Sequence, residues 1–344
     1  MTEPATATGV VLRPVKPTDA ELVWDLLAPA AADVIGMSSL PSSLEAAKQS
    51  CEDTAQTVAA LATDSFTLDG QQQRRLLFVA ADTQSETALG LTGVTFKHHW
   101  PNLAVKVSTS EDGHGLIMAS TSAPWTRTEL DSTYLGPQAR GRRIGSLLSR
   151  GRFMLLHLVH SQIPTTVASH LRGRFDADGS APFWGCFGLN FAPEWQTSTE
   201  AEIALIEQPN RLAGLADHML PLTAPVLDSL GPVNDASLPA FHMLRAEGLD
   251  PNGMYDPIDG GPTLRAELAN TVTGQTRSHG RVVIDELNPE DPNVVDSLVS
   301  VTTVARFRAT RAPVILDGTT ARLSAQTAAT LGIGPDTLVV AAPL

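Results

Sequence analysis

The chain has 344 residues, of which 24 are Lys or Arg and 37 are Asp or Glu, giving a formal net charge of -13. An acidic chain of this kind repels nucleic acid, so a nucleic-acid partner is disfavoured. Apolar residues make up 42% of the chain, which is enough for a core, and the length predicts two domains or one domain with an appendage. No run approaches eighteen apolar residues and the N-terminus lacks a signal-peptide pattern, so we expect no membrane association. The two cysteines, Cys51 and Cys186, lie far apart and are predicted to be free thiols in a reducing cytoplasm.

Apolar periodicity and turn residues predict the elements of the N-terminal part of the chain. In chain order, they are a strand at 9–16, a helix from 17, a loop at 36–43, a helix at 44–61, strands at 75–82 and 88–98, an irregular stretch of further short strands at 99–128 and a strand at 129–137.

The rest of the chain continues with alternating helices and strands. The predicted elements are a helix reaching about residue 160, a strand at 165–171, a short helix at 180–188, a strand at 189–195, mainly helices at 200–250, then strands, with a strand, short helix, turn and strand at the C-terminal end.

This order predicts an α+β fold with a central mixed sheet flanked by helices. We expect an N-terminal domain at 1–270 with a helical insertion around 200–250, and a small β-rich domain at 275–344 that contributes no catalytic group.

Basic residues are concentrated in one acid-free interval. No Asp or Glu occurs between Asp131 and Asp176, yet the interval contains seven arginines: Arg140, Arg142, Arg143, Arg150, Arg152, Arg172 and Arg174. A solvated surface normally mixes both signs of charge, so this interval indicates an anion site of a size that suits a phosphate-bearing small molecule.

The stretch "LGPQARGRRIGSLL" (135–148) reads as the end of a strand, a glycine-rich turn and the start of a helix. Such a turn presents free backbone N–H groups at the positive end of the helix dipole, where a pyrophosphate is stabilised. Gly141 and Gly145 allow the backbone to approach the ligand closely, although a tight turn with a purely structural role uses the same residues.

The string from Gln138 to Leu148 resembles the acyl-CoA signature Q/R-x-x-G-x-G/A of the GNAT superfamily, with Arg143 at the place of a glycine or alanine. A narrower resemblance, to the arginine N-succinyltransferase family, covers most of the chain. It rests on "GMSSLP" (36–41), "LRGRFDADGSAPFW" (171–184) and "LRAEGLDPNGMYDPIDGGP" (244–262).

The resemblance implies an acyltransferase that moves a succinyl group from succinyl-CoA, its acyl-donor co-substrate, to the α-amine of L-arginine, without a metal. It implies CoA contacts at the following residues: Thr133, Leu135, Gln138, Arg140, Gly141, Arg142, Arg143, Ile144 and Gly145. It also implies acceptor contacts at Ser38, Ser39, Arg172, Asp256 and Asp259.

The chain departs from the family pattern around the acceptor. Asn234 stands where the family has its proposed proton-donor histidine, and an amide cannot give up a proton as an acid. Thr133 replaces a leucine, and His170 replaces a glutamate beside the arginine–glycine pair. The family's aromatic loop is reduced to "HHWPNLAV" (98–105).

Several side chains have two interpretations. Glu129 could hold the incoming amine or be a structural strand residue, and Tyr134 could donate to the thiolate or pack in the core. Asp256 and Asp259 could bind a guanidinium or stabilise their own turn. His157 and His160 lie three residues apart on a helix without a third ligand nearby, so we expect no metal.

Three functions therefore remain open: an arginine N-succinyltransferase, an acyltransferase that uses another amine or acyl-CoA, and a weakly catalytic CoA-binding companion subunit. In each case we expect small-molecule substrates and possible homo- or hetero-oligomers.

Overall fold

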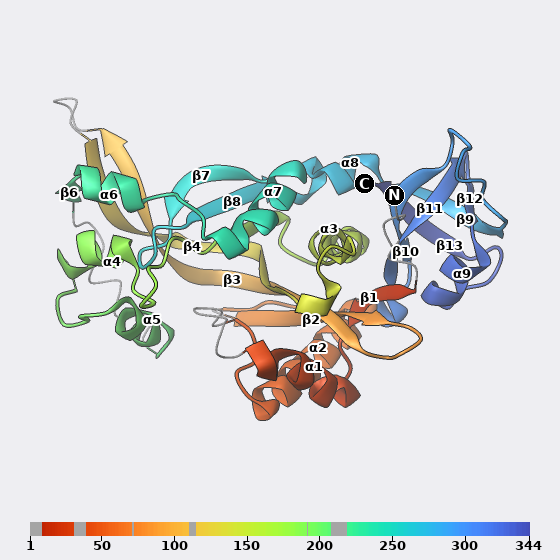
Figure 1. The fold of residues 1–344 in the computed structure, drawn as a ribbon, viewed down its shortest axis with the longest axis horizontal. Coiled ribbons are helices and arrows are strands. Elements are labelled where there is room, and N and C mark those ends of the chain that lie inside the picture. The colour runs from red at the N-terminus through yellow and green to blue at the C-terminus, as the bar shows by residue number, and fades with distance from the viewer. Residues whose placement is uncertain (1–8, 31–38, 71, 110–114, 191, 208–218) are drawn as a thin grey trace.

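A computed structural model describes residues 9–30, 39–70, 72–109, 115–190, 192–207 and 219–344 (Figure 1). Its central feature is a twisted mixed sheet. The strands that build it are β1 (Val10–Pro14), β2 (Gln72–Asp82), β3 (Ala88–Thr109), β4 (Gly115–Leu135), β5 (Thr166–His170), β7 (Asp250–Tyr255) and β8 (Pro262–Glu267). Strands β1 to β4 pair antiparallel in sequence order, and β5 runs parallel to β4.

Helices cover both faces of this sheet. On one face lie α1 (Ala20–Leu27) and α2 (Leu44–Ala62), and on the other lie α3 (Ile144–Leu158) and α7 (Leu238–Ala246) (Figure 1). Helix α2 begins at the Ser43 cap, whose hydroxyl accepts the Ala46 N–H at 3.1 Å. The expected α+β architecture is confirmed.

The strands expected within 99–128 are confirmed, but the irregular course and the short lengths are wrong. Strands β3 and β4 extend through this stretch as one long hairpin, paired as far as Thr109 and Gly115. Pro101 lies within β3, although a proline lacks the N–H that a ladder needs. The hairpin accommodates it with register shifts between Lys97 and Trp100 and again between Trp100 and Asn102.

The far end of this hairpin carries α4 (Pro182–Cys186), α5 (Ser198–Glu207), β6 (Met219–Pro221) and α6 (Ala224–Ser229) (Figure 1). The strand predicted at 189–195 is wrong. A 3-10 turn at Gly188–Asn190 and further reverse turns replace it. The backbone reverses so that Trp195 stacks near Trp184, whose indole N–H donates to the Trp195 carbonyl at 2.9 Å.

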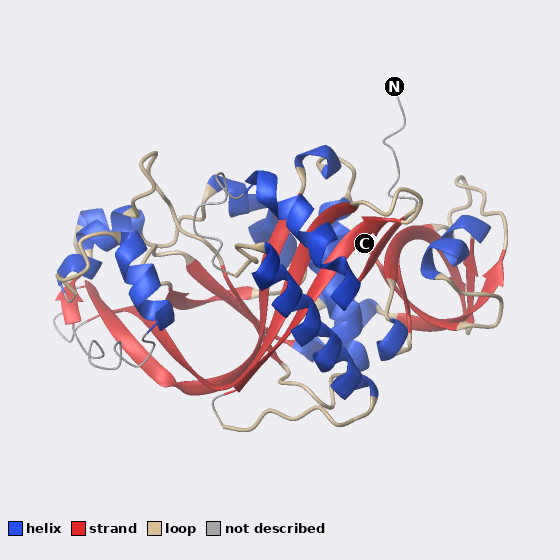
Figure 2. Ribbon diagram, turned by 90° about the horizontal axis from the view of Figure 1, so that it is seen from below, coloured by secondary structure: helices blue, strands red, loops and turns tan. Residues whose placement is uncertain are grey.

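The C-terminal strands close on themselves. The elements are β9 (Ser278–Ile284), β10 (Val295–Val301), β11 (Ala309–Asp317), β12 (Thr320–Leu323), α9 (Ala325–Leu331) and β13 (Leu338–Pro343), preceded by α8 (Val272–Thr276). The pairing order β10–β13–β9–β12–β11 returns to β10, and Figure 2 shows these strands as a ring at one end of the molecule. A separate buried cluster fills the ring, formed by Val282, Val299, Val314, Ala321, Leu323, Leu331, Val339 and Ala341.

The strand, helix, turn and strand predicted at the C-terminal end are confirmed. The division of the chain near residue 275 stays a prediction, since β11 also bridges to β1 at Leu12 and Ala309. Within the described part of the chain, no helix is long and apolar enough to cross a bilayer.

Strand β4 carries a bulge beside α3. Gly93 pairs with Asp131 but Leu91 pairs with Tyr134, so β4 has one residue more than β3 in this interval. Ser132 takes a positive φ of 55° there. From α3, the buried Arg152 donates through Nη1 to the carbonyl oxygens of Gly93 at 3.0 Å and Asp131 at 3.4 Å. Burial lowers the pKa of Arg152 to about 10, which leaves it charged at neutral pH.

Replacing Arg152 by Met should therefore destabilise the fold. The change removes charged donors from two carbonyl groups beside a bulge, and we expect the free energy of unfolding to fall by about 2–4 kcal/mol. Urea denaturation measures this loss. Arg174→Met is the control, because the Arg174 side chain is 58% exposed and should change stability by less than about 0.5 kcal/mol. Equal stability of the two variants would contradict the role given to Arg152.

Candidate active site

Strands β4 and β5 part beside the bulge. In the described structure they pair only at Thr128–Val167 and Glu129–Ala168. Beyond these pairs, the Ser169 hydroxyl donates to the Leu130 carbonyl at 3.0 Å, and β5 continues its pairing with β8 instead. The last residues of β4 therefore lack β5 as a neighbour, which leaves a strand edge where an extended ligand can form backbone hydrogen bonds.

The turn after β4 has the geometry of an anion cradle. Gly141 has φ 76° and Arg143 has φ 60°, both in the left-handed region, and α3 begins at Ile144. The acyl-CoA signature has a glycine or alanine at the place of Arg143, and the positive φ explains the glycine, because side chains are strained there. A Cβ at Gly141 would meet nothing within 4 Å, so the turn is open above this residue.

Only part of the arginine-rich interval faces this turn. Arg140 and Arg143 are exposed and Arg142 is half-buried. In contrast, Arg150 donates to the fully buried Glu247 at 2.6 Å, and Arg152 supports the bulge. The interpretation of all these arginines as one anion site is therefore wrong for the two that lie inside α3. Their partners, Glu247 and the backbone beside the bulge, hold both side chains against other parts of the protein.

The C-terminal strands support the start of α3. Arg311 of β11 donates to the Ser146 hydroxyl at 3.0 Å and to both carboxylate oxygens of Asp296. The same Asp296 lies 3.9 Å from a guanidinium nitrogen of Arg143. Gly145 lies close to α7, since a Cβ added to Gly145 would lie 3.7 Å from Cε of Met243.

Glu129 lies at the last β4–β5 pair among basic groups. Its Oε2 lies 2.8 Å from Lys97 Nζ, 3.1 Å from Arg127 Nε and 3.7 Å from His170 Nε2. Burial opposes ionisation, but these three neighbours outweigh it and hold the pKa of Glu129 well below its usual range. Glu129 is therefore a fixed carboxylate that orients its neighbours, and it is a weak proton acceptor.

The imidazole of His170 lies near Glu129. From the sequence, His170 was identified only as a departure from the family pattern. Burial lowers the pKa of His170, although Glu129 acts in the opposite direction. Its Nδ1 lies 2.9 Å from the Thr263 hydroxyl of β8, and this contact fixes the ring at the end of β5. A neutral imidazole with one nitrogen facing a carboxylate can accept a proton.

A cavity of about 540 Å³ lies between α2 and the sheet. Its lining includes Ser39, Asp53, Gln56, Thr57, Gln73, Arg74, Arg75, Thr95, Lys97, Glu129 and Asp131. The Ser39 carbonyl accepts hydrogen bonds from the Ser132 hydroxyl, at 2.9 Å, and from Arg75. The bulge therefore holds one predicted substrate residue, Ser39, at the cavity, while Ser38 lies outside the described residues.

Two glycine-bearing motifs, 171–184 and 244–262, are predicted to contact the acceptor. Their backbones pack directly against each other. A Cβ on Gly173 would lie 2.0 Å from the Asp259 carbonyl oxygen, and one on Gly261 would lie 2.0 Å from the Leu171 carbonyl oxygen. Arg172 Nε lies 3.5 Å from Asp259 Oδ2. The structure thus brings the predicted residues Arg172 and Asp259 together.

The two aspartates of this block differ in environment. Asp256 accepts the N–H groups of Ile258 and Asp259 at 2.8 and 3.1 Å, which is the turn-stabilising role. Asp259 is buried, and burial together with Asp256 raises its pKa to about 7, although Arg172 acts in the opposite direction.

Asn234 lies next to the same block. Its N–H donates to the Arg172 carbonyl at 2.9 Å, and its side-chain oxygen accepts the Ala236 N–H at 2.9 Å. The amide oxygen thus caps the short turn that leads into α7.

Tyr134 packs in the cluster that α1 and α2 form with the sheet, where it is 9% exposed. With Gln138 it lines a smaller cavity of about 450 Å³ beside α1. Thr133 contacts the Thr92 hydroxyl at 2.9 Å, and Leu135 packs against the core on the α3 side. The geometry favours the packing interpretation of Tyr134, and its role as a donor stays a prediction.

The two helical histidines have protein partners. His157 Nε2 lies 3.2 Å from the Thr271 hydroxyl, and His160 Nδ1 lies 2.9 Å from the His157 carbonyl oxygen. Across the described ranges, no group of three or more His, Cys, Asp or Glu is arranged to hold a metal.

Comparison with known proteins agrees with this architecture. The model of the arginine N-succinyltransferase beta subunit matches residues 10–273, and that of its C-terminal domain matches residues 279–343. An arginine N-succinyltransferase of Yersinia enterocolitica is 26% identical over 93% of this chain and 94% of its own length. The alpha subunit of a Pseudomonas aeruginosa arginine N-succinyltransferase is 26% identical over 94% of this chain and 97% of its own.

Among solved structures, subunit AI of the arginine/ornithine succinyltransferase of Pseudomonas aeruginosa has the same fold. The TM-score is 0.79 at 23% identity, over 98% of this chain and 99% of that one. Fold and family models together define an acyltransferase. The chain belongs to the arginine N-succinyltransferase family.

The contact between the two glycine motifs gives a stability test. In Gly261→Ala the new methyl group would meet backbone atoms that cannot rotate away, so we expect the free energy of unfolding to fall by about 2–3 kcal/mol. Thermal or urea denaturation measures the change. Gly185→Ala is the control, since its Cβ would meet nothing within 4 Å and lies in helix α4. Unchanged stability in Gly261→Ala would show that the two backbones are not in contact.

Proposed function

We propose that this protein transfers the succinyl group of succinyl-CoA to the α-amine of L-arginine, as a step of arginine catabolism. The observation that carries the proposal is the match of both family models, which together cover residues 10–273 and 279–343. The diverging strands and the left-handed turn before α3 supply a binding surface that fits acyl-CoA.

The turn would hold the CoA pyrophosphate. Backbone N–H groups from Gly141 to Gly145 lie at the start of α3, where the first amides of a helix have no partner within it. Gln138, Arg140, Arg142 and Arg143 would contact the phosphates. The pantetheine arm would then run along the free edge of β4, past Leu135 and Thr133, which brings the thioester to the bulge.

The acceptor would approach from the cavity of 540 Å³. Asp53, Glu129 and Asp131 line it and favour a cationic amino acid, while Ser39 lies at its wall. Lys97 and Arg75 also line it and suit a carboxylate. Asp256, Asp259 and Arg172 would complete the acceptor site.

The reaction is a direct attack in a ternary complex. The neutral α-amine attacks the thioester carbonyl carbon, a C–N bond forms, the C–S bond breaks, and the amine loses a proton. His170 would take that proton, and the Glu129 carboxylate, 3.7 Å from His170 Nε2, would orient the ring. The leaving thiolate needs little help, because a thiol has a reference pKa near 8.5.

Asn234 also supports an alternative. Its side chain caps a turn and donates no proton, so the chain could be a diverged acyltransferase with another amine or acyl group, or a companion subunit that binds CoA.

The relative from Pseudomonas aeruginosa is named as a subunit, which supports a homo- or hetero-oligomer. We propose a cytoplasmic location, which two free cysteines support.

Gly141→Asp should abolish CoA binding. The carboxylate would face the pyrophosphate at a position where only backbone fits, and repulsion replaces attraction. Gly141→Asn is a matched control, because Asn has the same shape and tolerates positive φ but carries no charge. Calorimetry should give a Kd for CoA at least about 100-fold weaker for the Asp variant than for the Asn variant. Tight binding by a folded Asp variant would overturn the cradle.

Asn234→His should raise the rate of succinyl transfer by about 10-fold. An imidazole there would protonate the departing thiolate, and the gain stays below the full value for an acid because the turn is adapted to an amide cap. The kcat with succinyl-CoA and arginine, from about pH 6 to 9, is the measurement. Asn234→Asp keeps a capping oxygen without an imidazole and serves as the control. A stable His variant with an unchanged rate would favour the diverged acyltransferase.

A further inference from the structure

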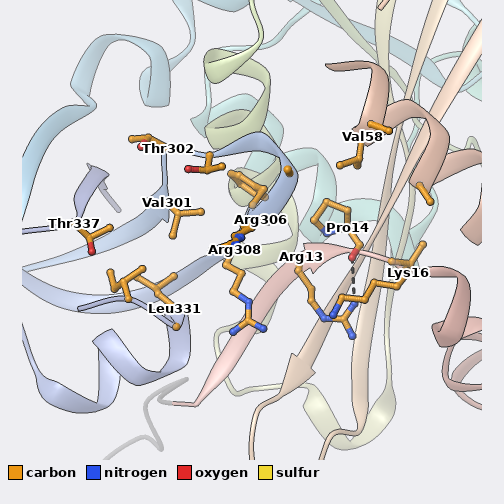
Figure 3. Close-up of a pocket in the computed structure, with 18 of the residues that line it drawn as sticks. Arg13, Pro14, Lys16, Val58, Val301, Thr302, Arg306, Arg308, Leu331 and Thr337 are labelled. Atoms are coloured by element: carbon orange, nitrogen blue, oxygen red, sulfur yellow. Dashed lines mark hydrogen bonds between the residues drawn. The ribbon is translucent and has the colours of Figure 1, made fainter. Parts of the chain in front are cut away.

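A second cavity lies outside the candidate active site. It has a volume of about 950 Å³ and opens between the end of β1, helix α2 and the C-terminal strands (Figure 3). Val58 of α2 and Leu331 of α9 form apolar parts of its wall, and Thr302 and Thr337 contribute hydroxyl groups.

The charge of this cavity has one sign. Arg13, Lys16, Arg306 and Arg308 line it, and none of its lining residues is Asp or Glu. This is unexpected in a chain with a net charge of -13. Like charges gathered in a concave site repel one another, and a bound anion relieves the repulsion.

Two of the four basic side chains are fixed by the fold. Arg13 forms hydrogen bonds to both carboxylate oxygens of Asp19, and Arg308 lies beside it because β1 and β11 pair at Leu12 and Ala309. Arg308 also donates weakly to the Thr330 carbonyl, at 3.5 Å. Figure 3 shows the heads of Arg13, Lys16 and Arg308 turned toward the same part of the cavity.

The other two remain available for a ligand. Lys16 and Arg306 are exposed, and in the described part of the chain no carboxylate oxygen lies within 4 Å of their charged nitrogens. Lys16 follows β1 and Arg306 precedes β11, and these strands pair at Leu12 and Ala309, so the two side chains come from neighbouring segments that both line the cavity. Four cationic side chains around one cavity match a ligand with more than one anionic group better than a single small ion.

We propose that this cavity binds a small polyanion, a molecule with at least two phosphate or carboxylate groups, at a site distinct from the CoA cradle. The cradle lies at the start of α3 near the β2–β3 turn, whereas this cavity begins at the opposite end of β1. The hydroxyl groups of Thr302 and Thr337 would add neutral donors. Binding should weaken as ionic strength rises.

Titration calorimetry on the full chain, with pyrophosphate and citrate as probes at constant ionic strength, tests the proposal. Excess CoA keeps the cradle occupied. The double variant Lys16→Gln, Arg306→Gln should bind the probes at least about 10-fold more weakly than the parent protein. The control Lys48→Gln, Arg322→Gln removes the same charges from exposed positions elsewhere and should bind as the parent does.

Each outcome of the titration either supports or contradicts a second anion site. Absence of binding by the parent protein, or equal binding by the two double variants, would overturn the proposal. If CoA itself does not bind, Arg142→Gln separates the two basic sites. Probe binding that is lost in Arg142→Gln but kept in the Lys16, Arg306 variant would assign the anion to the turn and overturn the second site.

Discussion

Arg152 donates from the middle of α3 to the carbonyl groups of Gly93 in β3 and Asp131 in β4, the pair beside the bulge. Without a charged donor, an extra residue in a buried strand leaves polar groups unsatisfied, which is costly. With the guanidinium of Arg152 in place, β4 can turn away from β5 while α3 stays packed over the sheet. The same bulge directs Ser132 toward the Ser39 carbonyl, so one local irregularity organises the strand edge and one wall of the cavity beside Glu129.

Helix α2 connects two cavities of different character. Asp53, Gln56 and Thr57 face the cavity beside Glu129, and Ala55, Val58 and Ala59 face the basic cavity. Because residues three or four apart share a face of a helix, each set forms a continuous wall. A small shift of α2 would alter both cavities together. The two cavities also differ in charge, because acidic and basic side chains line the one beside Glu129, whereas only basic side chains contribute charge to the other.

Sequence patterns located the parts of this site that depend on local chemistry. The glycine-rich turn and the amphipathic α3 follow from spacing alone, and Gly141 does take a left-handed conformation. The roles of Arg150 and Arg152 did not follow, because their partners, Glu247 and the bulge, are distant in sequence. The long β3–β4 hairpin was missed for a similar reason. Only register shifts in the partner strand show how Pro101 fits.

The C-terminal strands have their own core but are not independent of the proposed cradle. Arg311 holds the Ser146 hydroxyl in the first turn of α3 and shares Asp296 with Arg143, whose backbone is left-handed. A positive φ in an arginine costs free energy, so surrounding contacts must maintain it. The side chain of Arg143 is half exposed and its contact with Asp296 is long, which makes Arg311 and Ser146 the firmer support. The C-terminal strands thus help to hold the turn before α3 in its left-handed conformation.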